Sequence, residues 1–189
     1  ARDAPYKAPC SWGFFSSRLQ ARLARMPIQT LSRLADIDPA RWDALLVDNP
    51  RPFLRHAFLS ALEDSGSVGG RTGWRPHHQV LSDAQGDVIA ALPLYGKTNS
   101  NGEYVFDWAW ADACHRAGID YYPKLLCAVP FSPVTGARLL GDRAAAGRLL
   151  DQLMAELDAQ GHSSLHVNFT EPDADAIFQN RDGWLERIG

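Results

Sequence analysis

Two apolar runs stand near the end of the chain, KLLCAVPF at residues 124–131 and LHVNF at residues 165–169. Between them, residues 147–160 place four leucines on one side of a helix (Leu149, Leu150, Leu153 and Leu157). We therefore expect a strand, a helix and a second strand. This order favours a parallel crossover, because parallel neighbours need a long connection between them.

Upstream of the crossover, the pattern predicts antiparallel strands. Apolar runs at 79–81 and 88–95 flank the Gly- and Asp-containing segment 83–87, which suits a hairpin loop. Aromatic residues then alternate with other residues over 104–111, and this two-residue period predicts a strand with one aromatic face. Together with the crossover, these strands predict a mixed sheet.

Two helices are expected before the hairpin. Asp38 followed by Pro39 is a helix-start signal, and the apolar residues after it predict a short helix to about Asp48. Apolar residues recur in one wide helical stripe over 53–62.

Composition and charge exclude several classes of protein. The 189 residues are 46% hydrophobic and 22% charged, as in ordinary globular proteins, and no run is long and apolar enough for a transmembrane segment. Residues 1–25 carry five basic groups and one acidic group, so the rest of the net charge of −3 is acidic. We expect no DNA partner, because phosphate binding needs clustered cations. The three cysteines show no C-x-x-C spacing, which fits a reducing, cytoplasmic setting.

The domain boundary is expected at Met26. Residues 1–25 show no sustained periodicity, and we interpret them as an extraneous or disordered segment, either a transit-like peptide or an artefact of upstream translation. Residues 26–189 are expected to form one domain. The pairs His77-His78 and Cys114-His115 lack metal-ligand spacing, so the sequence indicates no metal site.

Candidate chemistry gathers around residues 107–124. Asp107 is expected on the strand face opposite the aromatics, where a half-buried carboxylate needs a partner. Asp112, Tyr121, Tyr122 and Lys124 follow closely enough to gather near it. Two interpretations stay open: the carboxylates hold loops by accepting backbone hydrogen bonds, or this group binds substrate and moves protons.

A second candidate lies between the last strand and the crossover helix. Arg138-Leu-Leu-Gly141-Asp-Arg143 partly matches the R-x-x-G-x-G/A loop with which GNAT-superfamily acetyltransferases bind coenzyme A. Arg143 stands at the last Gly/Ala position of that loop, where a side chain hinders close approach of a phosphate.

Longer strings carry a family resemblance. These are PFLRHAFL at 52–59, GEYVFDWAWA at 102–111, YYPKLL at 121–126 and VPFSPVTG at 129–136. With them, the chain resembles a bacterial FemAB-like, GNAT-type family of peptidoglycan biosynthesis or recognition. The resemblance covers residues 28–189 and implies an α/β (α+β) fold, a GNAT-like mixed and mainly antiparallel sheet flanked by helices. It also implies a tandem protein, of which this chain resembles the first half.

The resemblance implies an N-acyltransferase that joins an acyl or aminoacyl group to an amine, the acceptor being a cell-wall peptide precursor. No tightly bound cofactor is expected; acetyl-CoA, another acyl-CoA or aminoacyl-tRNA would be the donor co-substrate. On this interpretation, Asp107 or Asp112 is the base, Tyr121 or Tyr122 a proton donor and Lys124 a charge stabiliser. The donor-binding residues would be Val134, Thr135, Gly136, Arg138 and Gly141.

An alternative from another class is a recognition module without chemistry, binding a peptidoglycan-type peptide or glycan. The substrate-binding residues expected on either interpretation are Trp108, Trp110, Tyr122 and Phe131. The partners expected are a donor, an amine acceptor and a missing C-terminal GNAT-like half. Without that half, an uncovered sheet edge favours homodimerisation or aggregation.

Overall fold

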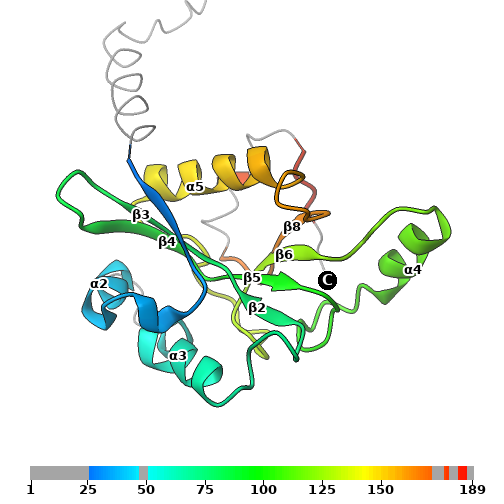
Figure 1. The fold of residues 1–189 in the computed structure, drawn as a ribbon, viewed down its shortest axis with the longest axis horizontal. Helices are drawn as coiled ribbons and strands as arrows, with labels where there is room; N and C mark the ends of the chain where they lie inside the picture. The colour runs from blue at the N-terminus through cyan, green and yellow to red at the C-terminus, as the bar shows by residue number, and fades with distance from the viewer. Residues whose placement is uncertain (1–25, 47–50, 172–176, 179–182, 187–189) are drawn as a thin grey trace, which may run out of the picture.

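A computed structural model describes residues 26–46, 51–171, 177–178 and 183–186. Figure 1 shows strands in the middle, helix α5 (Arg143–Glu156) over one side, and helices α2 (Pro39–Asp43) and α3 (His56–Asp64) on the other. The expected N-terminal segment 1–25 lies outside the described residues. In the part of the chain that is described, no helix combines the length and apolar character needed to cross a membrane.

One long hairpin is shared by two sheets. Its first arm is β2 (Trp74–Pro76) followed by β3 (His78–Ser82), and its second arm is β4 (Val88–Leu92) followed by β5 (Leu94–Lys97). β3 pairs with β4 and β2 pairs with β5, both antiparallel. At the tip, the Asp83 carboxylate accepts hydrogen bonds from the backbone amides of Gln85 and Asp87, each 2.9 Å long. The hairpin and loop predicted from sequence are confirmed.

Four further strands complete the two sheets. β1 (Ile28–Leu31) and β7 (Leu140–Gly141) flank the hairpin in the order β1-β3-β4-β7. β6 (Lys124–Cys127) and β8 (Leu165–Val167) extend the other sheet in the order β2-β5-β6-β8. Only β6 and β8 pair in parallel; the other described pairs are antiparallel. The predicted fold class, a mixed and mainly antiparallel α+β arrangement, is confirmed and is consistent with a GNAT-like fold.

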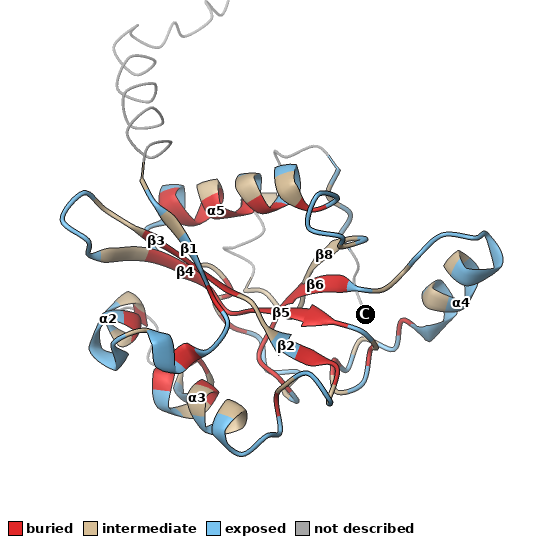
Figure 2. Ribbon diagram, viewed as in Figure 1, coloured by how far each residue is buried: buried red, intermediate tan, exposed pale blue. Residues whose placement is uncertain are grey.

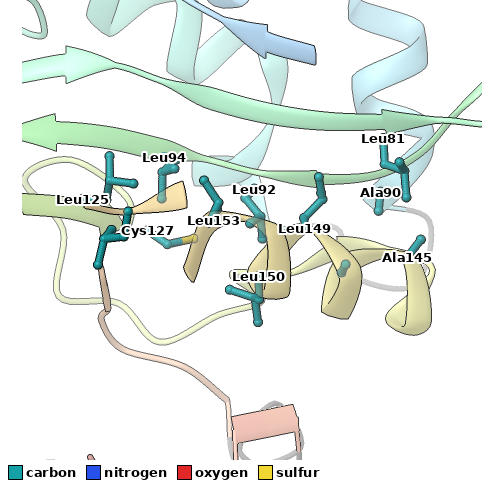
Figure 3. Close-up of a cluster of buried hydrophobic side chains, with 12 residues drawn as sticks. Leu81, Ala90, Leu92, Leu94, Leu125, Cys127, Ala145, Leu149, Leu150 and Leu153 are labelled. Atoms are coloured by element: carbon teal, nitrogen blue, oxygen red, sulfur yellow. The ribbon is translucent and has the colours of Figure 1, made fainter. Parts of the chain in front are cut away.

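The crossover helix α5 forms the main core with the strands. It begins four residues earlier than predicted, because the Asp142 carboxylate caps it by accepting a 2.8 Å hydrogen bond from the Ala145 amide. Its leucines, including Leu149 and Leu153, pack against Leu92, Leu94 and other buried strand residues (Figure 3). The two crossover strands are shorter than the apolar runs at 124–131 and 165–169 that predicted them.

The opposite face is covered by short helical segments. They are η1 (Leu34–Asp36), α2, η2 (Ala44–Leu46), η3 (Pro52–Leu54) and α3. The Asp38 carboxylate caps α2 by accepting from the Ala40 amide at 2.7 Å, as its sequence predicts. The predicted helix to Asp48 runs instead as α2 and a 3-10 turn up to Leu46, and residues 47–48 lie outside the described residues. Buried Trp42 fixes this layer because its indole N–H donates to the Leu54 carbonyl.

The strand predicted over 104–111 is wrong. Residues 104–107 form an irregular segment, and helix α4 (Trp108–Arg116) follows. Tyr104 and Phe106 have φ angles of 60° and 53°, the left-handed region that a β-strand cannot contain. Helix α4 stands out from the sheets, and none of its residues is buried (Figure 2). Trp108 and Trp110 therefore point to different sides, because residues two apart do not share a helix face.

Candidate functional site

Two lysines lie side by side at the ends of neighbouring strands. Lys97, the last residue of β5, is the register partner of Lys124, the first residue of β6. Both side chains are completely buried. Two like charges directly opposite each other across strands are destabilising, and buried charges need partners. The sheet therefore requires negative charge at this edge.

The loop between β5 and α4, residues 98–107, supplies that charge. Lys124 Nζ lies 2.9 Å from Glu103 Oε2 and 2.6 Å from Asp107 Oδ2, and Lys97 Nζ lies 3.8 Å from Glu103 Oε1. Lys97 also lies 3.7 Å above the centroid of the Trp74 ring, a cation–π contact. We call Lys97, Glu103, Asp107 and Lys124 the charge cluster. It contains two positive and two negative groups and is sealed from solvent.

Two tyrosines and a serine connect the charge cluster to the surface. The Tyr121 hydroxyl donates to Asp107 Oδ2 at 2.6 Å, and the Tyr122 hydroxyl lies 2.6 Å from Ser100 Oγ. Lys124, which can only donate, gives Ser100 Oγ a 3.2 Å hydrogen bond. Both phenols are half-buried, whereas the four charges are not accessible. Any ligand at this edge therefore meets the phenols and not the charges.

The direction of these hydrogen bonds follows from the donor inventory. Tyr121 donates inward, because the Asp107 carboxylate can only accept. The Tyr121 oxygen therefore has only lone pairs left for a ligand. In the contact between Ser100 Oγ and the Tyr122 hydroxyl, either oxygen can be the donor.

The charge cluster shifts the ionisation of its members. Burial disfavours the Asp107 carboxylate, but hydrogen bonds from Lys124, Ser100 and Tyr121 overcome it and lower the pKa of Asp107 to about 2. Burial raises the pKa of Glu103 although both lysines oppose this shift. Burial lowers the pKa of Lys97 to about 8. The pKa of Tyr121 is raised, by burial first and then by its bond to Asp107, so the phenol keeps its proton at neutral pH.

An aromatic rim of Phe106, Trp108 and Phe131 lies on the same loop, on α4 and after β6. The side chains of Phe106 and Trp108 are 67% and 58% exposed, and their ring centroids are 5.7 Å apart in an edge-to-face pair. Phe131 packs on Trp74 with a centroid distance of 5.5 Å and lies over Gly102, where a Cβ atom would come 2.5 Å from its ring. Exposed apolar patches of this kind often mark a site that binds a ligand or a partner.

The structure brings Asp107, Tyr121, Tyr122 and Lys124 together but leaves Asp112 out. Asp112 is exposed on α4, where it pairs with Arg116 at 2.6 Å, four residues away. The sequence interpretation grouped the two aspartates by assuming a strand, and the helix separates them. Asp107 itself is nearly fully buried rather than half-buried.

The predicted donor-binding residues lie beyond the other end of β6. The Arg138 guanidinium is buried and donates to the carbonyls of Val134, Ala137 and Asn168. The Gly136 amide donates to the Phe169 carbonyl, and Thr135 accepts from Arg51 through its carbonyl. Gly141 belongs to β7, and a Cβ there would come 2.3 Å from the Ile89 carbonyl oxygen. These groups hold the crossover loop to the parallel strands.

Sequence reasoning missed three members of the site: Ser100, Lys97 and Glu103. Lys97 is the last residue of β5. Its pairing with Lys124 depends on the β5–β6 register, which no local pattern encodes. The usable signal was that both strands begin or end with a lysine in an otherwise apolar run.

Fold and site together define a class: a mainly antiparallel α+β protein with a sealed lysine–carboxylate cluster under two tyrosines and an aromatic rim. Residues 33–189 match the model of the FemAB-like family, described as peptidoglycan biosynthesis/recognition, and the chain belongs to this family. Membership gives the chain a peptidoglycan-related function, in transfer or in recognition. No curated protein and no solved structure matches the chain.

Proposed function

We propose that this protein acts in N-acyl transfer to an amine of a peptidoglycan peptide precursor, and that Tyr121 and Tyr122 bind the acceptor amine. The observation that carries the proposal is the inward direction of the Tyr121 phenol proton, toward Asp107. A phenol oxygen that can only accept favours a ligand that donates, such as an ammonium or amine N–H.

The chemistry requires a neutral amine that attacks an activated carbonyl, as in an acyl thioester or an aminoacyl ester. The acceptor ammonium loses one proton, and the neutral amine forms an N–C bond to the acyl carbon. The C–S or C–O bond of the donor breaks, and the second amine proton passes to the leaving sulfur or oxygen, which departs as thiol or hydroxyl. Asp107 is a poor base at neutral pH because its pKa is about 2 and its carboxylate is engaged. We therefore assign Asp107 and Lys124 to holding Tyr121 in its accepting orientation, and the ammonium proton leaves to water.

The test compares a free amine with a blocked one. A stem peptide with a side-chain amine and its N-acetylated form are titrated against the protein by calorimetry. We expect Tyr121→Phe to weaken binding of the free amine at least tenfold and to leave the acetylated peptide unchanged. Tyr104→Phe, which alters an exposed phenol on the same loop, is the matched control. Equal binding of both peptides by the unaltered protein would refute the amine site.

Transfer itself is tested by mass spectrometry. The peptide is incubated with the protein and either an acyl-CoA or an aminoacyl-tRNA, and the mass added to the peptide identifies the donor. We expect Tyr121→Phe to lower the yield, whereas Tyr104→Phe should not. If neither donor adds mass to the peptide while the amine-dependent binding is intact, the protein is a recognition module and not a transferase.

The second candidate is a recognition module, favoured by the exposed Phe106–Trp108 pair on a helix without buried residues. Exposed aromatic rings can stack on the apolar faces of sugars and on peptide side chains. In this case glycan-peptide fragments should bind without any acyl donor. Trp108→Ala should weaken that binding, and Trp110→Ala, on another side of α4, should not.

A further inference from the structure

Two histidines approach each other outside the charge cluster. His77 links β2 to β3, and its backbone amide donates to the Leu94 carbonyl at 2.9 Å. His162 follows α5, its amide donates to the Leu157 carbonyl, and its ring lies near Gly96 of β5. The two ring centroids are 5.7 Å apart. Residues far apart in the sequence thus place two imidazoles together on the β2–β5 sheet.

Each imidazole has a buried nitrogen that lacks a hydrogen-bond partner among the described residues, Nε2 of His77 and Nδ1 of His162. Buried polar atoms nearly always have a partner, so both nitrogens require an explanation. The Gln160 side chain also contacts the His77 ring and opposes the lowering of the His77 pKa.

In a neutral imidazole one ring nitrogen carries a proton and the other a lone pair, so an unpartnered ring nitrogen can ligate a metal. Neutral imidazole is the metal-binding form.

The spacing of the rings also fits a shared ion. A metal about 2.1 Å from an imidazole nitrogen lies roughly 3 Å from the ring centroid, so two imidazoles on one ion have centroids roughly 5–6 Å apart. The observed separation of 5.7 Å falls in this range. Imidazole nitrogen suits zinc, nickel and copper, whereas magnesium and calcium prefer oxygen ligands.

We propose that His77 and His162 together bind one divalent transition-metal ion, such as Zn²⁺ or Ni²⁺, with water completing its coordination. The described residues contain no group of three or more His, Cys, Asp and Glu side chains arranged to hold a metal. Only two protein side chains would ligate the ion, and the positive charge of Arg75 lies near both rings. We therefore expect the ion to bind reversibly. It is separate from the proposed amine site and does not depend on it.

The test is calorimetric titration of the untagged protein with Zn²⁺, with Mg²⁺ as the control ion. We expect one Zn²⁺ per chain, no Mg²⁺ binding, and at least tenfold weaker Zn²⁺ binding in His77→Ala and in His162→Ala. His115→Ala, which removes an exposed imidazole on α4, is the matched control and should bind like the unaltered protein.

A thermal melt separates metal binding from damage to the fold. Zn²⁺ should raise the Tm of the unaltered protein and of His115→Ala but not that of His162→Ala, because a ligand that binds only the native state stabilises it. The metal-free Tm of His162→Ala shows whether this loop variant folds. Unchanged Zn²⁺ affinity in His162→Ala, or no Zn²⁺ binding by the unaltered protein, would overturn the proposal.

Discussion

Lys124 is the residue whose loss we expect to destabilise the protein most directly. Its ammonium touches Glu103, Asp107 and Ser100 inside the protein. Lys124→Met would remove the cation that pairs with Asp107 and leave Glu103 with Lys97, 3.8 Å away. Breaking a buried ion pair from one side costs about 3–5 kcal/mol. Urea denaturation should show this loss in the free energy of unfolding.

The control for that measurement is Arg116→Met, which breaks the exposed pair with Asp112. Exposed pairs contribute less than about 1 kcal/mol, so this variant should unfold close to the unaltered protein. Equal effects of the two substitutions would mean that the charge cluster does not stabilise the fold.

Asp107 gives the protein a specific acid sensitivity. Its pKa is about 2 in the folded protein and 3.8 ordinarily, so the folded state binds the proton less readily than the unfolded state does. This stabilisation is complete above about pH 4 and is lost as the pH falls through 2. In Asp107→Asn, the free energy of unfolding should fall less steeply between pH 4 and 2, as measured by urea titrations at each pH. Parallel pH profiles for the two proteins would contradict the assignment.

Among the elements, α5 depends on its cap. The Asp142 carboxylate satisfies the Ala145 amide, and α5 carries the leucines of the main core. Asp142→Ala should cost about 1 kcal/mol, typical of a lost N-cap, and lower the urea midpoint. Asp120→Ala, in the exposed loop after α4, should change stability by less than half as much. A larger loss of stability in Asp120→Ala than in Asp142→Ala would show that the loss of a negative charge, and not the loss of the cap, causes the destabilisation.

The elements predicted well from sequence are those in which the period of the apolar residues coincides with the face that is buried. The hairpin at 83–87, α3 and the crossover each bury a face that local periodicity reveals. The segment 104–111 misled because its alternation arises from loop residues with positive φ followed by a helix. A two-residue period is informative only where the backbone is extended.

The residues of the candidate site also fall into those that local sequence predicts and those that only the tertiary structure brings together. Asp107, Tyr121 and Lys124 were found because they lie close in sequence, and the structure gathers them. Lys97 and Glu103 join only through strand register and loop path. The bonding of Arg138 to carbonyls on two segments likewise depends on tertiary contacts, which a motif match cannot provide.

At the scale of the whole molecule, the strands separate two apolar layers. Leu149 of α5 belongs to the cluster on one face and Leu59 of α3 to the cluster on the other, and both are essentially buried. The strands β3 and β4 contribute residues to both clusters, such as Leu81 and Val80 from neighbouring positions of β3. The two layers are therefore coupled through shared strands, and we expect them to unfold together.

The test uses Leu149→Ala and Leu59→Ala, each of which should cost about 2–5 kcal/mol by leaving a cavity. Because the two sites lie in separate clusters, the double variant should lose the sum to within about 0.5 kcal/mol. Urea unfolding is followed by tryptophan fluorescence and by circular dichroism, which reports on the helices. Of the six tryptophans, Trp42 and Trp74 are fully buried, so their exposure on unfolding should change the fluorescence. Coincident transitions are expected for a single cooperative unit. A fluorescence transition that Leu59→Ala shifts while the circular dichroism transition stays in place would show that the α2–α3 layer unfolds independently of α5.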